Sequence, residues 1–110
     1  MDIAEERVDG IQVLAPAGRL DGNSSKMLDD RLAAIPGDCK ALVLDLGSLD
    51  YVSSAGLRVL LKQAKQAKAS GSKLALCSLH PNVQEVFDIS GFTSLFTIKA
   101  DRAAALAALG

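Results

Sequence analysis

The sequence predicts one α/β domain over residues 1–110, with about four helices on a mixed, mostly parallel sheet of about four to five strands. Short apolar runs alternate with stretches of helical spacing along the chain. Two of these runs, Ala41–Leu46 and Lys73–Leu79, are almost continuously apolar, as in strands buried on both faces. With 110 residues, 49% of them hydrophobic, the chain can fill one core and has little room for a second.

The chain opens with a predicted hairpin. Apolar-bearing strands at 3–8 and 11–18 flank Asp9-Gly10, a pair typical of a tight turn between antiparallel strands. Pro16 has no amide hydrogen, so we expect the second strand to be irregular there or to lie at a sheet edge. The residue types at 19–23 predict a turn that contains several candidate helix caps.

Helices and strands alternate in the rest of the chain. Apolar residues at helical spacing predict a first helix from Ser24 that Pro36-Gly37 stops. After the strand Ala41–Leu46 and a Gly-Ser turn, the later elements are a helix over 54–69 ended by Gly71, the strand 73–79, a helix over 81–89 with Pro81 in its first turn, a short strand over 96–98, and a helix over 102–109 capped by Asp101.

The predicted order is therefore β-β-α-β-α-β-α-β-α. Alternation of this kind favours parallel strands with helices packed on the sheet. Functional groups in such sheets collect where the carboxyl ends of strands meet the starts of helices. We expect the turns at Asp21 and at Ser53-Ser54 to share that edge.

Composition and charge argue against several classes of function. The net charge of −1, the 4% aromatic content and the absence of Trp give no basic field or stacking platform for nucleic acid. Residues 1–52 carry ten acidic and five basic side chains, whereas residues 53–110 carry three and seven. This asymmetry is either ordinary variation between surface elements or a face prepared for a charged protein partner.

The cysteines and the amino-terminal residues indicate a reduced, cytoplasmic protein. Cys39 and Cys77 lack CxxC or metal-type spacing; we expect Cys77 in the core and Cys39 to be partly exposed. The acidic start is unlike a secretion signal, and no apolar run approaches the roughly 20 residues of a membrane span. We expect no metal and no cofactor.

Ser53 and Ser54 are the main candidates for function. One serine would suffice to cap the helix that follows. A second hydroxyl beside Ala55-Gly56, at the positive end of the helix dipole, could hold a phosphate or accept one from a kinase. The residue spacing alone does not decide whether the serine pair is only a helix cap or also a functional site.

The segment Leu44–Leu61 resembles the signature of STAS domains, specifically of bacterial anti-sigma factor antagonists. That family typically has Asp-Ser-(Ser/Ala)-Gly-Leu between a strand and a helix, and the serine after the Asp is phosphorylated. Aligning Gly56-Leu57 with this pattern places the acceptor at Ser54, with Ser53 in place of the family's Asp and as a second candidate acceptor. Gly18–Asp21 also resembles the family's Gly-x-Leu-Asp.

The resemblance implies a partner switch. The unphosphorylated domain would bind an anti-sigma factor and release a sigma factor for transcription; the anti-sigma factor, a GHKL-type serine kinase, would phosphorylate Ser54, and a serine phosphatase would reset the cycle. The expected binding edge comprises Asp21, Gly22, Asn23, Ser24, Ser53, Ser54, Ala55, Gly56 and Arg58. The protein would be a kinase substrate and not an enzyme, a monomer or a weak dimer.

Other interpretations of these residues stay open. Asp21 could simply form an N-cap or an Asx-turn. The exposed bases Arg58, Lys62, Lys65 and Lys68 could serve only to solvate the helix. The same fold could be a scaffold in a stressosome or a lipid-transport complex.

A serine hydrolase or a nucleotide-binding protein is disfavoured. The Gly-x-Ser-x-Gly pattern is incomplete around Ser54, and a catalytic triad would have to use His80, the single histidine. No glycine-rich phosphate loop occurs.

Overall fold

The computed structural model describes residues 1–35 and 39–109, so the predicted stop at Pro36-Gly37 lies outside the described residues. The elements are, in chain order, β1 (Asp2–Val8), β2 (Ile11–Leu20), α1 (Ser25–Ala33), β3 (Ala41–Asp45), β4 (Leu49–Val52), α2 (Ser54–Ser70), β5 (Lys73–Cys77), α3 (Pro81–Ile89), the 3-10 turn η1 (Thr93–Leu95), β6 (Thr97–Lys99) and α4 (Arg102–Leu109).

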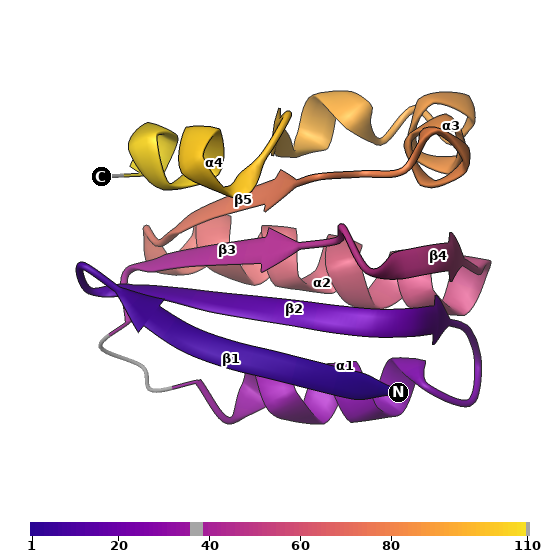
Figure 1. Cartoon of the computed structure of the whole chain (residues 1–110), viewed down its shortest axis with the longest axis horizontal. Helices are drawn as coiled ribbons and strands as arrows, with labels where there is room; N and C mark the ends of the chain where they lie inside the picture. Colours follow the sequence, from indigo (N-terminus) through magenta and orange to yellow (C-terminus); the bar gives the residue numbers. More distant parts are fainter. Residues whose placement is uncertain (36–38, 110) are drawn as a thin grey trace.

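The strands form one mixed sheet in the order β1-β2-β3-β5-β6, with β4 paired to β2 (Figure 1). The β1–β2 hairpin is antiparallel, and the other pairs are parallel, as predicted. Asp9 and Gly10 have φ angles of 51° and 82°, which is the left-handed backbone that a two-residue hairpin turn requires. The predicted α/β class and the mostly parallel sheet are confirmed.

The sheet has six strands among the described residues, not four to five, because β4 replaces part of the predicted turn. Strand β2 also runs to Leu20, two residues beyond its predicted end. It pairs with β3 over Gln12–Leu14 and with β4 over Gly18–Leu20. Of the two alternatives expected at Pro16, the edge position is wrong, because β2 lies inside the sheet. The irregular strand is confirmed: Pro16 falls where β2 changes its parallel neighbour, and the register shifts between Gly18 and Arg19.

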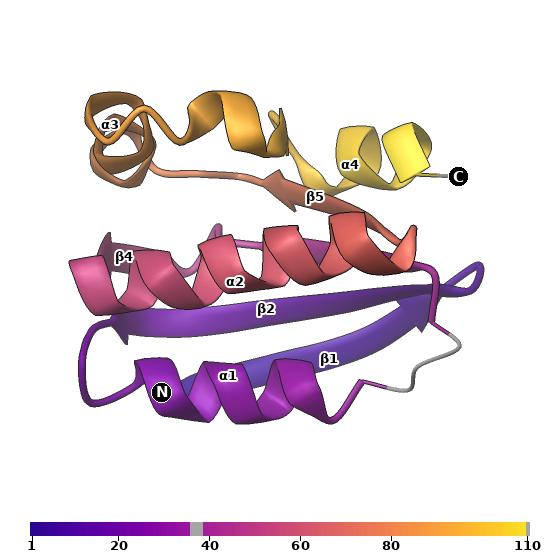
Figure 2. The same ribbon diagram turned by 180° about the vertical axis from the view of Figure 1, so that it is seen from behind.

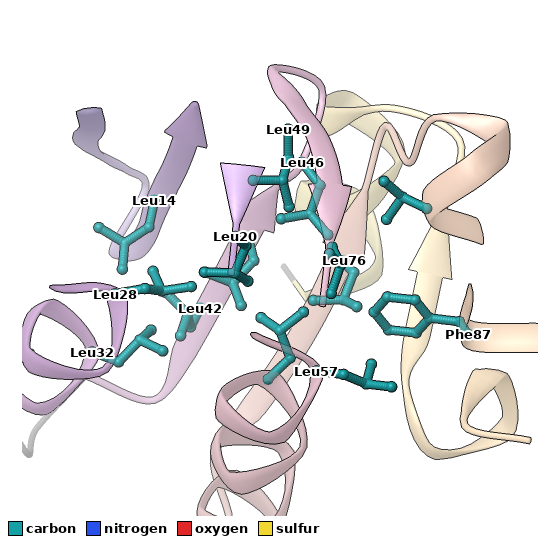
Figure 3. Packing of buried hydrophobic residues seen from close by; sticks show 14 residues of the cluster. Leu14, Leu20, Leu28, Leu32, Leu42, Leu46, Leu49, Leu57, Leu76 and Phe87 are labelled. Atoms are coloured by element: carbon teal, nitrogen blue, oxygen red, sulfur yellow. The ribbon is translucent and has the colours of Figure 1, made fainter. Parts of the chain in front are cut away.

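Helices cover both faces of the sheet. Leu14 of β2 and Leu42 and Leu44 of β3 point to one face and belong to the core cluster. The same cluster contains Leu28 of α1 and Leu60 of α2. Figure 2 shows α1 and α2 side by side on that face, and Figure 3 shows the leucines of the helices meeting those of the strands. The opposite face packs against α4 through the second cluster, formed by Ile11, Val13, Val43, Ala75, Cys77, Ala105 and Leu109.

Candidate functional site

The ends of β2 and β4 bring two turns together at one edge of the sheet. Leu20 pairs with Val52 in the parallel register, so Asp21 and Ser53 follow neighbouring strand ends. The amide of Ser53 donates a hydrogen bond to the carbonyl oxygen of Leu20 at 2.8 Å. The prediction that these turns share an edge is confirmed.

Gly56 allows α2 to begin directly against the end of β2. A Cβ atom at this position would lie 2.6 Å from Cγ of Leu20 and 2.7 Å from its carbonyl oxygen, closer than real Cβ contacts. The glycine is buried, and Leu57 beside it enters the core. The Gly-Leu pair therefore fixes the position of the serines relative to the Asp21 turn.

The two serines have different environments. Ser53 is the N-cap residue of α2, with an extended backbone, and its Oγ accepts a hydrogen bond from the amide of Gly56 at 3.2 Å. Ser54 is the first helical residue and is exposed. Its hydroxyl makes no side-chain hydrogen bond within residues 1–35 and 39–109. One hydroxyl thus stabilises the helix, and the other is open to solvent.

Asp21 organises the turn before α1. Its Oδ1 accepts hydrogen bonds from the amides of Asn23 (3.0 Å) and Ser24 (3.2 Å), which confirms the Asx-turn interpretation. The amide of Ser24, followed by that of Asn23, lowers the pKa of the Asp21 carboxyl below its ordinary value. The N-cap position of α1 belongs to Ser24, whose Oγ accepts from the amide of Asp21 at 3.0 Å.

Side chains that the sequence analysis did not single out support this edge. The guanidinium carbon of Arg19 lies 4.2 Å from the centre of the Tyr51 ring, a cation–π contact between paired residues of β2 and β4. Asn82 Nδ2 donates to the carbonyl oxygen of Asp50 at 2.6 Å, which links α3 to β4. Only recognition of β4 and its register could have identified these contacts from the sequence.

Among residues 1–35 and 39–109, one base of α2 has an ion-pair partner and three have none. Lys62 forms an ion pair with Asp29 of α1, with Nζ 3.2 Å from Oδ1, so it links the two helices. Arg58, Lys65 and Lys68 are exposed. Arg58 lies one turn beyond Ser54, on the part of α2 nearest the site.

The remaining polar groups have structural contacts. Nε2 of His80 donates to the carbonyl oxygen of Gly47 at 2.7 Å, so the ring holds the β3–β4 loop. Cys77 is buried, as predicted, and this burial raises the pKa of its thiol; Cys39 is partly exposed. The described residues contain no group of three or more His, Cys, Asp or Glu side chains placed to hold a metal ion. None of the described helices has both the length and the apolar character needed to span a membrane.

Comparison with known proteins identifies the family. The model of the STAS domain matches residues 2–105. The chain is 43% identical over 109 residues to BtrV of Bordetella bronchiseptica, which is named as a candidate anti-sigma factor antagonist; the match covers 98% of this chain and 94% of BtrV.

Solved structures agree in fold. The crystal structure of a candidate anti-sigma factor antagonist from Thermotoga maritima has a TM-score of 0.92 at 18% identity, covering 97% of this chain and 93% of that one. The Bacillus cell fate determinant SpoIIAA in its phosphorylated form has a TM-score of 0.74 at 17% identity, covering 97% and 99%. Its unphosphorylated form gives 0.77 at 20% identity, covering 94% and 92%. As its sequence motifs predicted, the chain belongs to the STAS domain family.

Proposed function

We propose that this protein is an anti-sigma factor antagonist, a regulatory binding protein and not an enzyme. In its unmodified form it binds an anti-sigma factor, and phosphorylation of Ser54 releases that partner. The name of the 43% identical relative supports the first part of the proposal. The existence of SpoIIAA structures in phosphorylated and unphosphorylated forms supports the second.

The exposed hydroxyl of Ser54 carries this proposal. Ser53 accepts the hydrogen bond that caps α2, so a phosphoryl group on its oxygen would disturb the cap. Ser54 has no such structural task and stands at the surface. We therefore assign the phosphorylation to Ser54 and not to Ser53, the second candidate.

The electrostatics of the helix start are consistent with a switch that leaves the fold intact. A phosphoserine carries about −1.5 to −2 charges, which the helix dipole stabilises by roughly 0.3–1 kcal/mol at an exposed N-terminus. A partner packed on Ser54 would instead have to bury a dianion, which is strongly unfavourable without a matching cation. The modification would thus block binding by contact.

The proposed partner surface surrounds this hydroxyl. It comprises the loop residues Asp21, Gly22, Asn23 and Ser24, the start of α2 at Ser53, Ser54, Ala55 and Gly56, and Arg58 one turn further along. The anti-sigma factor would also be the GHKL-type kinase that modifies Ser54, and a serine phosphatase would reverse the step. All of these partners would act in the cytoplasm, because the sigma factor and the ATP that the kinase uses are both found there.

Incubation of the protein with the host's candidate kinase and ATP, followed by intact mass and site mapping, tests the assignment. We expect one phosphoryl group at Ser54, absent from Ser54→Ala and retained by Ser53→Ala. Ser53→Ala is the matched control, because it removes the neighbouring hydroxyl at a cost of about 1 kcal/mol in helix capping. Modification of Ser53 in the wild-type protein, or persistent modification of Ser54→Ala, would refute the assignment.

A further inference from the structure

The start of α2 carries no negative charge of its own. The first turn of the helix contains no acidic residue, and its cap, Ser53, is neutral. The exposed amide groups of a helix N-terminus carry a partial positive charge that nothing in this turn offsets. The first full charge on the helix is the guanidinium of Arg58, four residues after Ser54.

Arg58 has no carboxylate within ion-pair distance among the residues that the structure describes. By contrast, ion pairs engage Lys26, Arg31, Lys62 and Arg102. Lys62, the next base along α2, is held by Asp29 of the neighbouring helix. Arg58 is therefore exposed and available at the position nearest the site.

The other charged groups at this edge are occupied or acidic. Asp21 accepts hydrogen bonds from its own loop, Arg19 lies over the ring of Tyr51, and His80 donates to the carbonyl of Gly47. Asp50, the second residue of β4, is exposed and carries the same sign as a phosphate. Among these groups, Arg58 is the cation free to meet a new anion.

The spacing between Ser54 and Arg58 suits such a contact. Residues i and i+4 of a helix are neighbours on its surface, and the favourable order places the anion on the amino-terminal side. An arginine presents a planar fork of donors that matches the oxygens of a phosphate. Both conditions hold for an anion attached to Ser54.

We propose that Arg58 binds the phosphoryl group on Ser54 and acts as a positioning residue for the phosphorylated state. This inference rests on the proposed phosphorylation of Ser54. In the unmodified protein the guanidinium is free to contact an acidic group of the partner; in the phosphorylated protein the phosphate occupies it. One modification would thus remove two contacts from the docking surface, the small hydroxyl and the arginine.

The test uses full-length protein with phosphoserine genetically encoded at position 54, so that no kinase is needed. Phosphorus-31 NMR measures the second pKa of the phosphate as pH is varied. A nearby cation favours the dianion, so we expect this pKa to be lower in wild type than in Arg58→Gln by about 0.3 of a pH unit at low salt. This difference in pKa should shrink at 1 M salt, where the Debye length falls to about 3 Å and charges farther apart than that interact only weakly.

Two further variants separate the contact from a general loss of charge. Arg58→Lys should keep much of the shift, because it retains a positive charge with poorer geometry. Lys65→Gln removes a positive charge from an exposed position of the same helix that is farther from Ser54. In this variant the second pKa of the phosphoserine at position 54 should equal that of wild type. An unchanged pKa in Arg58→Gln, or an equal rise in Lys65→Gln, would overturn the proposed contact.

Failure of this inference is distinguishable from failure of the proposed function. If Arg58→Gln has no effect on the titration but the encoded phosphoserine still abolishes binding of the anti-sigma factor, only the arginine contact is wrong. If the encoded phosphoserine leaves binding unchanged, the proposed switch at Ser54 is wrong, whatever the titration shows.

Discussion

At the residue scale, Gly56 determines how closely α2 approaches the end of β2. Its missing side chain leaves space that Leu20 fills with both its backbone carbonyl and its side chain. The carbonyl of Leu20 also accepts the hydrogen bond from Ser53, so any shift of the helix would disturb the capped serine pair. Gly56 is thus a positioning residue for Ser54.

We expect Gly56→Ala to be destabilising, although alanine favours helices over glycine by about 1 kcal/mol. The added methyl would overlap Leu20, and overpacking of this kind costs roughly 1–3 kcal/mol. Urea unfolding followed by circular dichroism measures the change. Gly22→Ala is the control, since a Cβ there meets nothing within 4 Å; equal stability of the two variants would contradict the packing argument.

Asp21 gives stability a specific dependence on pH. Amides of Ser24 and Asn23 lower the pKa of its carboxyl in the folded state. The unfolded chain then binds the proton more readily, so the stabilisation is present above the unfolded pKa and is lost as pH falls through the folded pKa. Below both values the contribution is gone.

The comparison of wild type with Asp21→Asn isolates this effect. Asparagine keeps an oxygen that can accept the same amide bonds but does not titrate. The advantage of wild type in urea midpoint should be constant near neutral pH and decline at acidic pH below about 4. An advantage that is independent of pH, or that grows with acidity, would show that the charge of Asp21 does not matter.

At the scale of elements, long periodic patterns in the sequence predicted the helices and strands correctly, whereas a segment of only four residues was missed. The stripe of Leu57, Leu60 and Leu61 correctly predicted α2, since a 17-residue helix repeats its period several times. Strand β4 has four residues, Leu49–Val52, too few to establish alternation, and its neighbouring Gly47-Ser48 indicated a turn. The partner of β2 beyond Pro16 was therefore missed, as was the register that pairs Arg19 with Tyr51.

Helix α2 is held on the sheet by its apolar side. Leu60 is fully buried in the core cluster, whereas Lys62 is exposed in an ion pair with Asp29. Leu60→Ala should cost about 2–5 kcal/mol of unfolding free energy, because it leaves a cavity. Lys62→Gln should cost under about 1 kcal/mol, as is usual for exposed ion pairs. Urea denaturation of both variants compares them directly, and a reversed order would contradict this account of how the helix is held.

At the scale of the whole molecule, the candidate site lies at the sheet edge and outside the core. The leucines that join the helices to the sheet are buried in the core cluster, whereas Ser54 is exposed, so a charge added there need not enter the apolar interior. The sequence was sufficient to predict this edge, because helices begin where parallel strands end. Residue spacing alone did not show which serine caps α2, and only the resemblance to the family motif ranked Ser54 ahead of Ser53 as the acceptor. The structure adds that the Ser53 hydroxyl is the one that accepts from the amide of Gly56.

The most direct test of the central claim compares binding with and without a phosphoryl group at Ser54. Titration calorimetry of the anti-sigma factor with the unmodified protein and with the protein carrying encoded phosphoserine at position 54 gives both affinities. We predict at least about a 100-fold loss of affinity on phosphorylation, equivalent to about 2.7 kcal/mol, with an unchanged circular dichroism spectrum. Equal affinities, or a phosphorylated protein that has unfolded, would contradict the account.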